Sequence, residues 1–263
     1  MSFHPEQYAA QEKKILPVLL LLDVSGSMAG EKIEALNECA SQMIKTFATA
    51  PENEVEIQVA IITFCDQVAV HTKFESAQTL VGRGWLDLVA GGRTCLGGAL
   101  DLGYQMLEDR TVLPRAIYRP AVVVVSDGKP TDQWEAPLER FITEGRASKS
   151  QRFAIPIGAD VQKEPLERFT GCIYHVFPAD NVEKLKAHFA YITQTLSQRS
   201  GSVNPNVVAT PPTAQNSDPS QSAQRVQSIL SSGGQQPTST TEGAPSQPTD
   251  PLVESYNYND DDI

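Results

Sequence analysis

Residues 16–28 read LPVLLLLDVSGSM, an apolar run of strand length that ends in a carboxylate and two hydroxyls. Strands that are buried on both faces of a parallel sheet have such continuous apolar sequences, so we expect a central strand here. Open α/β sheets bind their ligands beyond the carboxyl ends of the strands, where Asp23, Ser25 and Ser27 follow. Their oxygen atoms are of the type that Mg²⁺, Mn²⁺ or Ca²⁺ prefers. An alternative is that these residues only cap the following helix, because Asp and Ser are favoured there as well.

Two later segments place oxygen-bearing side chains at equivalent positions. Residues 121–128 read AVVVVSDG, a second apolar strand that ends at Asp127. Thr94 follows Gly91-Gly92-Arg93 in a flexible loop before a helical pattern. Because each segment follows a strand or precedes a helix, we expect all of these side chains at the same edge of the sheet. Their convergence favours a cation site over separate caps and turns.

The rest of the chain alternates between helical and strand patterns. Apolar residues recur at helical spacing in Glu31–Ala48 and in residues 96–107, 138–142, 166–169 and 182–196. Strands are predicted at Val55–Phe64 and residues 67–74, which form an antiparallel hairpin at a sheet edge, and at residues 153–157 and 173–177. Asp132 is expected to cap the helix after it and Trp134 to pack. The alternation predicts an α/β protein with a doubly wound, mostly parallel sheet and one antiparallel edge strand.

The three oxygen-bearing segments together resemble the von Willebrand factor type A (VWA) family and its metal-ion-dependent adhesion site, known as MIDAS. The match runs from residue 16 to about residue 196 and fills all five metal-site positions, which are Asp23, Ser25, Ser27, Thr94 and Asp127. The stretches LPVLLLLDVSGSM, GGRTCLGGAL and VVVVSDGKPTDQW are similar to the bacterial TerY-type branch, which is associated with tellurite resistance and stress response. Arg93 departs from the family pattern of Gly-Gly-Thr and puts a cation beside the threonine.

This resemblance implies a Rossmann-like fold and a divided ligand set. Ser25, Ser27 and Thr94 would contact the metal directly, and Asp23 and Asp127 largely through water. Three neutral hydroxyls neutralise little of the ion's charge, and Mg²⁺ commonly keeps waters. An acidic residue of a protein partner could replace one water, which describes a non-catalytic binding module. TerY-type proteins are encoded beside Ser/Thr kinases and metal-dependent phosphatases, which are therefore implied as candidate partners.

Composition divides the chain of 263 residues and net charge −11 into three parts. We assign residues 1–14 to a flexible N-terminus, 15–199 to the VWA domain and 200–263 to a disordered tail, which is rich in Ser, Thr, Pro and Gln and acidic. An acidic balance without a basic run argues against nucleic acid and membrane as partners. We find no signal-peptide pattern or spanning segment, and the dispersed cysteines lack zinc spacing. A cytoplasmic protein with reduced thiols is expected.

Other functions stay open. A phosphatase-like hydrolase is disfavoured, because the haloacid-dehalogenase motif needs Asp-x-Asp where this chain has Asp23-Val24-Ser25, and no serine elbow, P-loop or general base is recognisable. A metal-independent scaffold would differ from the binding module in its partner binding, which would not need magnesium. The tail, with Thr and Ser at residues 210–213 and 237–241, could be a regulatory phosphorylation substrate, or its terminal acids at 260–262 could occupy the metal site in cis.

Overall fold

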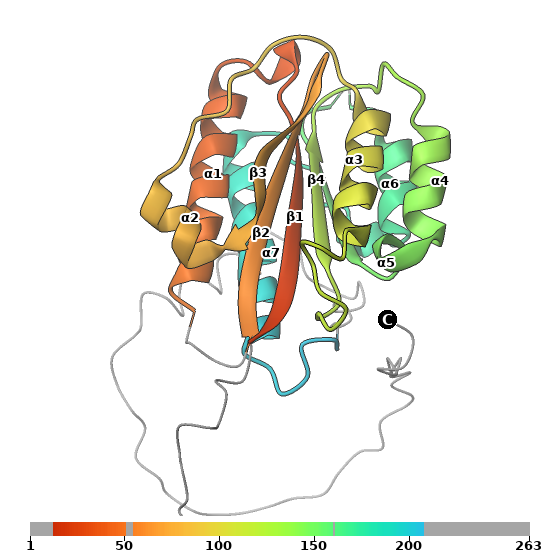
Figure 1. Cartoon of the computed structure of the whole chain (residues 1–263). Coiled ribbons are helices and arrows are strands. Elements are labelled where there is room, and N and C mark those ends of the chain that lie inside the picture. The colour runs from red at the N-terminus through yellow and green to blue at the C-terminus, as the bar shows by residue number, and fades with distance from the viewer. Residues whose placement is uncertain (1–12, 51–54, 160, 208–263) are drawn as a thin grey trace, which may run out of the picture.

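The computed structural model describes residues 13–50, 55–159 and 161–207. They form a five-stranded sheet between two layers of helices (Figure 1). The predicted N-terminal segment and tail lie almost entirely outside these ranges, so the phosphorylation and cis-ligand hypotheses fall on residues that the structure does not describe.

The sheet has the strand order β3-β2-β1-β4-β5. In the middle, β1 (Lys14–Asp23) pairs in parallel with β2 (Val55–Phe64) on one side and β4 (Ala121–Ser126) on the other. Beyond β4, β5 (Gln151–Pro156) is also parallel, whereas β3 (Val68–Ser76) runs antiparallel to β2 at the opposite edge. The predicted α/β class, the mostly parallel sheet and the antiparallel edge strand are confirmed.

Between its terminal Lys14 and Asp23, the central strand β1 is apolar, because both faces of the strand are buried from Leu16 onward. Val18, Leu20 and Leu22 pack into one hydrophobic core, and Leu19 and Leu21 pack into the other. All five are 0% exposed, and burial of each such side chain stabilises the fold by roughly 1.5–3 kcal/mol. Slipping the strand by one residue would exchange every side chain between the two cores. The packing therefore fixes where β1 ends and where Asp23 lies.

Helices cover both faces of the sheet (Figure 1). One core includes residues of α1 (Glu31–Ala48), α2 (Ala77–Arg83) and α7 (Val182–Ser200). The other includes residues of α3 (Leu96–Glu108), α4 (Glu135–Thr143), α5 (Gly145–Ser148) and α6 (Lys163–Thr170). The five predicted helices are present, whereas α2 and α5 were not predicted, because each is too short to show a helical period. Among the described helices, none is long and apolar enough to cross a membrane.

The predicted strand at residues 173–177 is wrong in its extent. Residues Ile173–His175 form a 3-10 turn, and two isolated bridges follow it, from Val176 to Ala154 of β5 and from Ala179 to Ile157 just after β5. The Phe177 and Ala179 N–H groups donate to Ala154 and Pro156 carbonyls. The ladder is interrupted between them because Pro156 has no N–H to return to this segment.

The described chain continues past residue 199 and closes against the domain. Ser200 is the last residue of α7. The Arg199 guanidinium, which is 5% exposed, donates to the Pro205 carbonyl and to Gln151 of β5. The Asn206 side chain accepts from the Arg119 N–H at 2.7 Å. The first residues of the predicted tail are thus hydrogen-bonded to α7 and to the segment just before β4.

Candidate metal centre

At the carboxyl end of β1 the chain turns directly into a 3-10 helix, Gly26–Met28. The Ser25 N–H donates to Asp23 Oδ1 at 2.8 Å, a turn that Asp forms readily with the backbone two residues on. Ser25 Oγ then lies 3.0 Å from Ser27 Oγ. Ser25 precedes the 3-10 helix without a side-chain capping bond, and the N-cap of α1 is Gly30. The capping alternative is therefore wrong for these serines.

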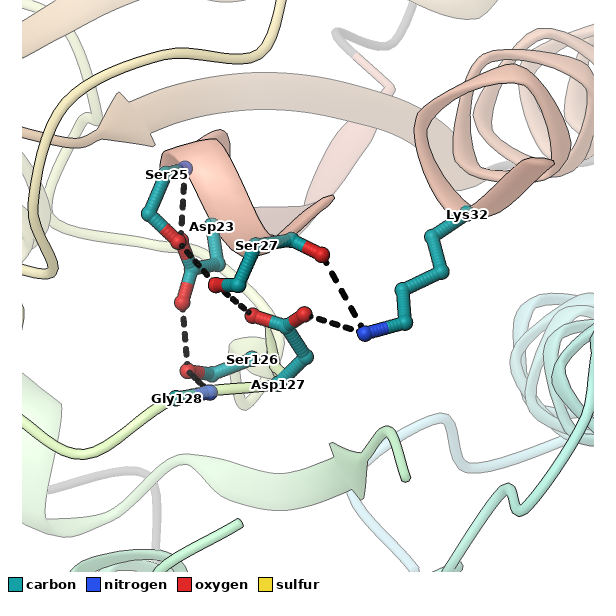
Figure 2. A network of polar contacts seen from close by, with 7 residues as sticks. All are labelled: Asp23, Ser25, Ser27, Lys32, Ser126, Asp127 and Gly128. Atoms are coloured by element: carbon teal, nitrogen blue, oxygen red, sulfur yellow. Dashed lines mark hydrogen bonds and ion pairs between the residues drawn. The ribbon is translucent and has the colours of Figure 1, made fainter. Parts of the chain in front are cut away.

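The end of β4 brings a second carboxylate to the same place (Figure 2). Ser27 Oγ donates to Asp127 Oδ1 at 2.7 Å, and the ammonium of Lys32 donates to Asp127 Oδ2 at 2.5 Å. Ser126 Oγ donates to Asp23 Oδ2 at 2.6 Å. Two hydrogen bonds therefore join the ends of two adjacent parallel strands across about a hundred residues of sequence.

Thr94 reaches the site on the loop before α3. The Gly91 N–H donates to the Val24 carbonyl, and the Gly26 N–H donates to the Gly92 carbonyl, so the loop lies along the β1 turn. The Thr94 carbonyl accepts from the Thr131 N–H at 2.8 Å, which ties the same loop to the segment after β4. A Cβ atom at Gly128 would lie 2.8 Å from Thr94 Oγ1. The threonine hydroxyl thus packs against the residue next to Asp127.

Two further carboxylates hold this loop. Asp66 Oδ1 accepts from the Arg93 backbone N–H and from Arg93 Nε, so the extra arginine is paired. Asp132 accepts from the Gly97 and Gly98 N–H groups, at 3.1 and 2.9 Å. It therefore caps the start of α3, the helix before it, and the prediction that it caps the next helix is wrong. The error arises because local sequence order cannot show that the segment after β4 folds back onto α3.

Trp134 is buried, as predicted, at 7% exposed. It stands at the N-cap position of α4 and its ring lies under the Arg168 guanidinium, 5.4 Å from the ring centroid. Its burial in the core leaves the indole to packing rather than to contact with a partner.

The cluster is buried on most sides and open at one. Asp23, Ser25, Thr94 and Asp127 are between 0% and 8% exposed, whereas Ser27 is exposed. Burial raises the pKa of Asp23, hydrogen bonds from Ser126 and Ser25 oppose this shift, and the nearby charge of Asp127 adds to it. Two buried carboxylates this close would be stabilised by a cation.

The donor set fits a hard divalent ion. In an octahedral site with roughly 2.0–2.1 Å bonds, neighbouring oxygen ligands lie about 3.0 Å apart. Ser25 Oγ and Ser27 Oγ are separated by this distance. No group of three or more His, Cys, Asp or Glu side chains suited to a metal is found among the described residues, because this cluster consists of two carboxylates and three hydroxyls.

The structure brings all five predicted side chains to one edge of the sheet, and adds residues that were not predicted. These are Lys32, Asp66, Ser126 and Gly128. Ser126 and Gly128 had a signal in the sequence, since they flank Asp127 at the end of an otherwise apolar strand. The others are identified only by contacts between segments distant in sequence.

Fold and site define an α/β protein with a candidate cation site at the carboxyl edge of its sheet. The family model of the von Willebrand factor type A domain matches residues 18–191, and the chain belongs to this family. No curated protein matches the sequence.

Solved structures share the fold at low sequence identity. A von Willebrand factor type A protein from Catenulispora acidiphila is 21% identical with a TM-score of 0.54, over 69% of this chain and 42% of that one. Proximal thread matrix protein 1 from the mussel byssus, with a zinc-occupied MIDAS motif, is 18% identical with a TM-score of 0.54, over 71% of this chain and 46% of that one. The pilus adhesin SpaC from Lactobacillus rhamnosus GG, in its open conformation, is 16% identical with a TM-score of 0.59, over 71% and 30%. This chain therefore spans less than half the length of these proteins.

Proposed function

We propose that this protein binds a divalent metal ion through Ser25, Ser27 and Thr94, with Asp23 and Asp127 in support, and uses it to bind an acidic residue of a protein partner. The observation that carries this proposal is the convergence of three hydroxyls and two carboxylates, with Ser25 Oγ and Ser27 Oγ 3.0 Å apart and Ser27 Oγ 2.7 Å from Asp127. The zinc-occupied MIDAS motif of the mussel protein supports a metal at the corresponding position of the fold.

The choice of ion follows from the ligand atoms. All candidate ligands are oxygen, which suits Mg²⁺, Mn²⁺ or Ca²⁺, whereas zinc sites in proteins are usually built from Cys and His. We therefore propose Mg²⁺, with Mn²⁺ or Ca²⁺ as substitutes.

Binding rather than catalysis is supported by how the carboxylates are used. Asp23 accepts hydrogen bonds from Ser25 and Ser126, and Asp127 accepts from Ser27 and Lys32. Both carboxylates are engaged by the protein's own donors, which favours a structural and metal-supporting role over that of a general base. The metal would supply an electrophilic position for an incoming carboxylate, and the protein would hold that position open beside Ser27.

The partner surface is expected to be acidic. Arg93 lies one residue before Thr94, and its side chain is 73% exposed while it pairs with Asp66. A positive charge at this rim would attract a carboxylate toward the ion and would weaken binding to a basic surface. Because Asp66 balances the Arg93 charge, the preference for an acidic partner rests mainly on the ion itself.

The cellular role is proposed from the sequence resemblance alone. The TerY-type stretches suggest a cytoplasmic complex of tellurite resistance or stress response, with a Ser/Thr kinase and a metal-dependent phosphatase as candidate partners. The same resemblance makes the tail a candidate phosphorylation substrate.

Isothermal titration of Mg²⁺ and Mn²⁺ into the full chain tests the metal site. Thr94→Val and Asp23→Asn should abolish saturable one-site binding, since each removes an oxygen function without changing side-chain size. Thr193→Val is the matched control, because its buried hydroxyl bonds to the Phe189 carbonyl within α7. Equal binding by all four proteins would refute the assignment of the site. A partner that binds equally well with Mg²⁺ and with EDTA would favour the metal-independent scaffold.

A further inference from the structure

Lys32 touches the carboxylate that the metal site needs. Its ammonium lies 2.5 Å from Asp127 Oδ2 and 3.2 Å from the Ser27 carbonyl (Figure 2). The Asp127 side chain is fully buried, whereas the Lys32 side chain is 37% exposed. The lysine therefore reaches inward from the surface of α1 to a buried charge.

The position of Lys32 on its helix indicates that the contact with Asp127, and not the helix, favours a lysine there. It is the second residue of α1, where the helix dipole disfavours a cation and favours the acidic residues Glu31 and Glu34. The lysine therefore gains nothing from its own helix, and its favourable interactions lie with Asp127 and the Ser27 carbonyl. Both Asp127 oxygens are then occupied, because Ser27 donates to the other one.

Ion and ammonium would compete for the same carboxylate. A divalent ion beside Ser25, Ser27 and Thr94 would add a double charge close to the Lys32 ammonium. The Coulomb repulsion between a single and a double charge about 6 Å apart in water already corresponds to roughly a tenfold loss of affinity. A partner carboxylate that joins the ion would offset this repulsion.

We propose that Lys32 is an internal counter-ion of Asp127 that competes with the divalent ion, so that lasting occupancy of the site depends on the carboxylate of a partner. This inference rests on the proposed function and adds its regulation: metal binding and partner binding become coupled through one lysine. It predicts a weak intrinsic affinity for Mg²⁺ that removal of the ammonium increases.

The test compares Lys32→Met, which keeps the side-chain length without the charge, with Lys129→Met. Lys129 is an exposed lysine two residues after Asp127, and it is not among the described residues that form ion pairs. The dissociation constant for Mg²⁺ is measured by titration at low ionic strength, and thermal unfolding is measured in EDTA. Lys32→Met should bind Mg²⁺ at least about tenfold more tightly and should melt at a lower temperature in EDTA. Lys129→Met should match the wild type in melting temperature, and it should change the dissociation constant for Mg²⁺ much less than Lys32→Met does.

The outcomes separate this inference from the proposed function. If the wild type binds Mg²⁺ and Lys32→Met binds it with the same or a lower affinity, the competition is overturned while the metal site stands. An unchanged melting temperature in EDTA overturns the counter-ion role. Saturable binding in neither the wild type nor Lys32→Met refutes the metal site itself, and the competition with it. Lys32→Gln, which can still donate to Asp127, should also bind more tightly, and it decides the question if Lys32→Met does not fold.

Discussion

Removing the hydroxyl of Ser126 should destabilise the protein more than its size suggests. In Ser126→Ala, the fully buried Asp23 loses the hydrogen bond that it accepts at 2.6 Å. A hydrogen bond to a charged group contributes about 1.5–3 kcal/mol. In a domain of this size, about 2 kcal/mol corresponds to a fall in melting temperature of roughly 4–8 °C.

The loss should depend on pH in a definite direction. Burial raises the pKa of Asp23 and the Ser126 hydrogen bond lowers it, so the substitution raises the folded pKa further. A carboxyl group with a raised folded pKa loses stabilisation as the pH rises from its ordinary value, 3.8, through the folded value. The difference between Ser126→Ala and the wild type should therefore be larger at pH 8 than at pH 4.

Urea unfolding of both proteins in EDTA at these two pH values measures the effect. Ser150→Ala is the matched control, since its buried hydroxyl donates to a neutral carbonyl, that of Ala147, at 2.6 Å. The free energy of unfolding of the control should fall by about 0.5–1.5 kcal/mol at both pH values. A loss in Ser126→Ala that equals the control and does not change with pH would refute the reasoning.

Three further substitutions test the support of the site and the acid sensitivity of the fold. Gly128→Ala should weaken Mg²⁺ binding in titration, because its Cβ would lie 2.8 Å from Thr94 Oγ1; unchanged affinity would show that the threonine can move without loss. Asp132→Ala should lower the free energy of unfolding in urea by about 0.5–2 kcal/mol, the usual effect of losing a helix cap, and a loss no larger than that of an exposed substitution would contradict the cap of α3. Burial lowers the pKa of His188 from 6.5, so the unfolded chain takes up the proton first and stability falls as the pH drops below 6.5. His188→Gln should flatten this fall in urea unfolding between pH 7.5 and 5, and an unaltered slope would assign it to other groups.

The elements whose burial is periodic or continuous could be predicted from sequence. Glu31–Ala48 was predicted with the bounds of α1, because its apolar face repeats over five turns. β1 and β4 were predicted because burial on both faces gives each a continuous apolar run before its polar end. The strand at 173–177 failed because Ile173–His175 form a 3-10 turn, and the pairing after that turn is interrupted by Pro156 in the neighbouring strand.

The residues of the candidate site also fall into those that the sequence predicts and those that only the fold reveals. Its five oxygen-bearing residues follow strands or precede a helix, and the topology alone brings such positions together. Lys32 and Asp66 contact the site from a helix surface and a hairpin turn, where charged residues are ordinarily solvated, so nothing in their local sequence distinguishes them. Asp132 was correctly predicted to cap a helix, but it caps α3 and not α4, the helix that follows it in the sequence. Only the fold shows that the start of α3 lies beside it.

The two aspartates that end buried strands have different tasks, although their sequence contexts are alike. Asp23 is 0% exposed, and its oxygens accept from the β1 turn and from the end of β4, so it joins two strands whether or not an ion is bound. Asp127 accepts from the exposed Ser27 and from Lys32, whose side chain is 37% exposed. Loss of the Asp23 carboxylate should therefore disturb the geometry of the whole site, whereas in the proposed competition Asp127 is the carboxylate for which the Lys32 ammonium and an ion compete. The proposed site would then be held firmly at Asp23 and would exchange its cation at Asp127, as a centre that binds an ion and a partner reversibly requires.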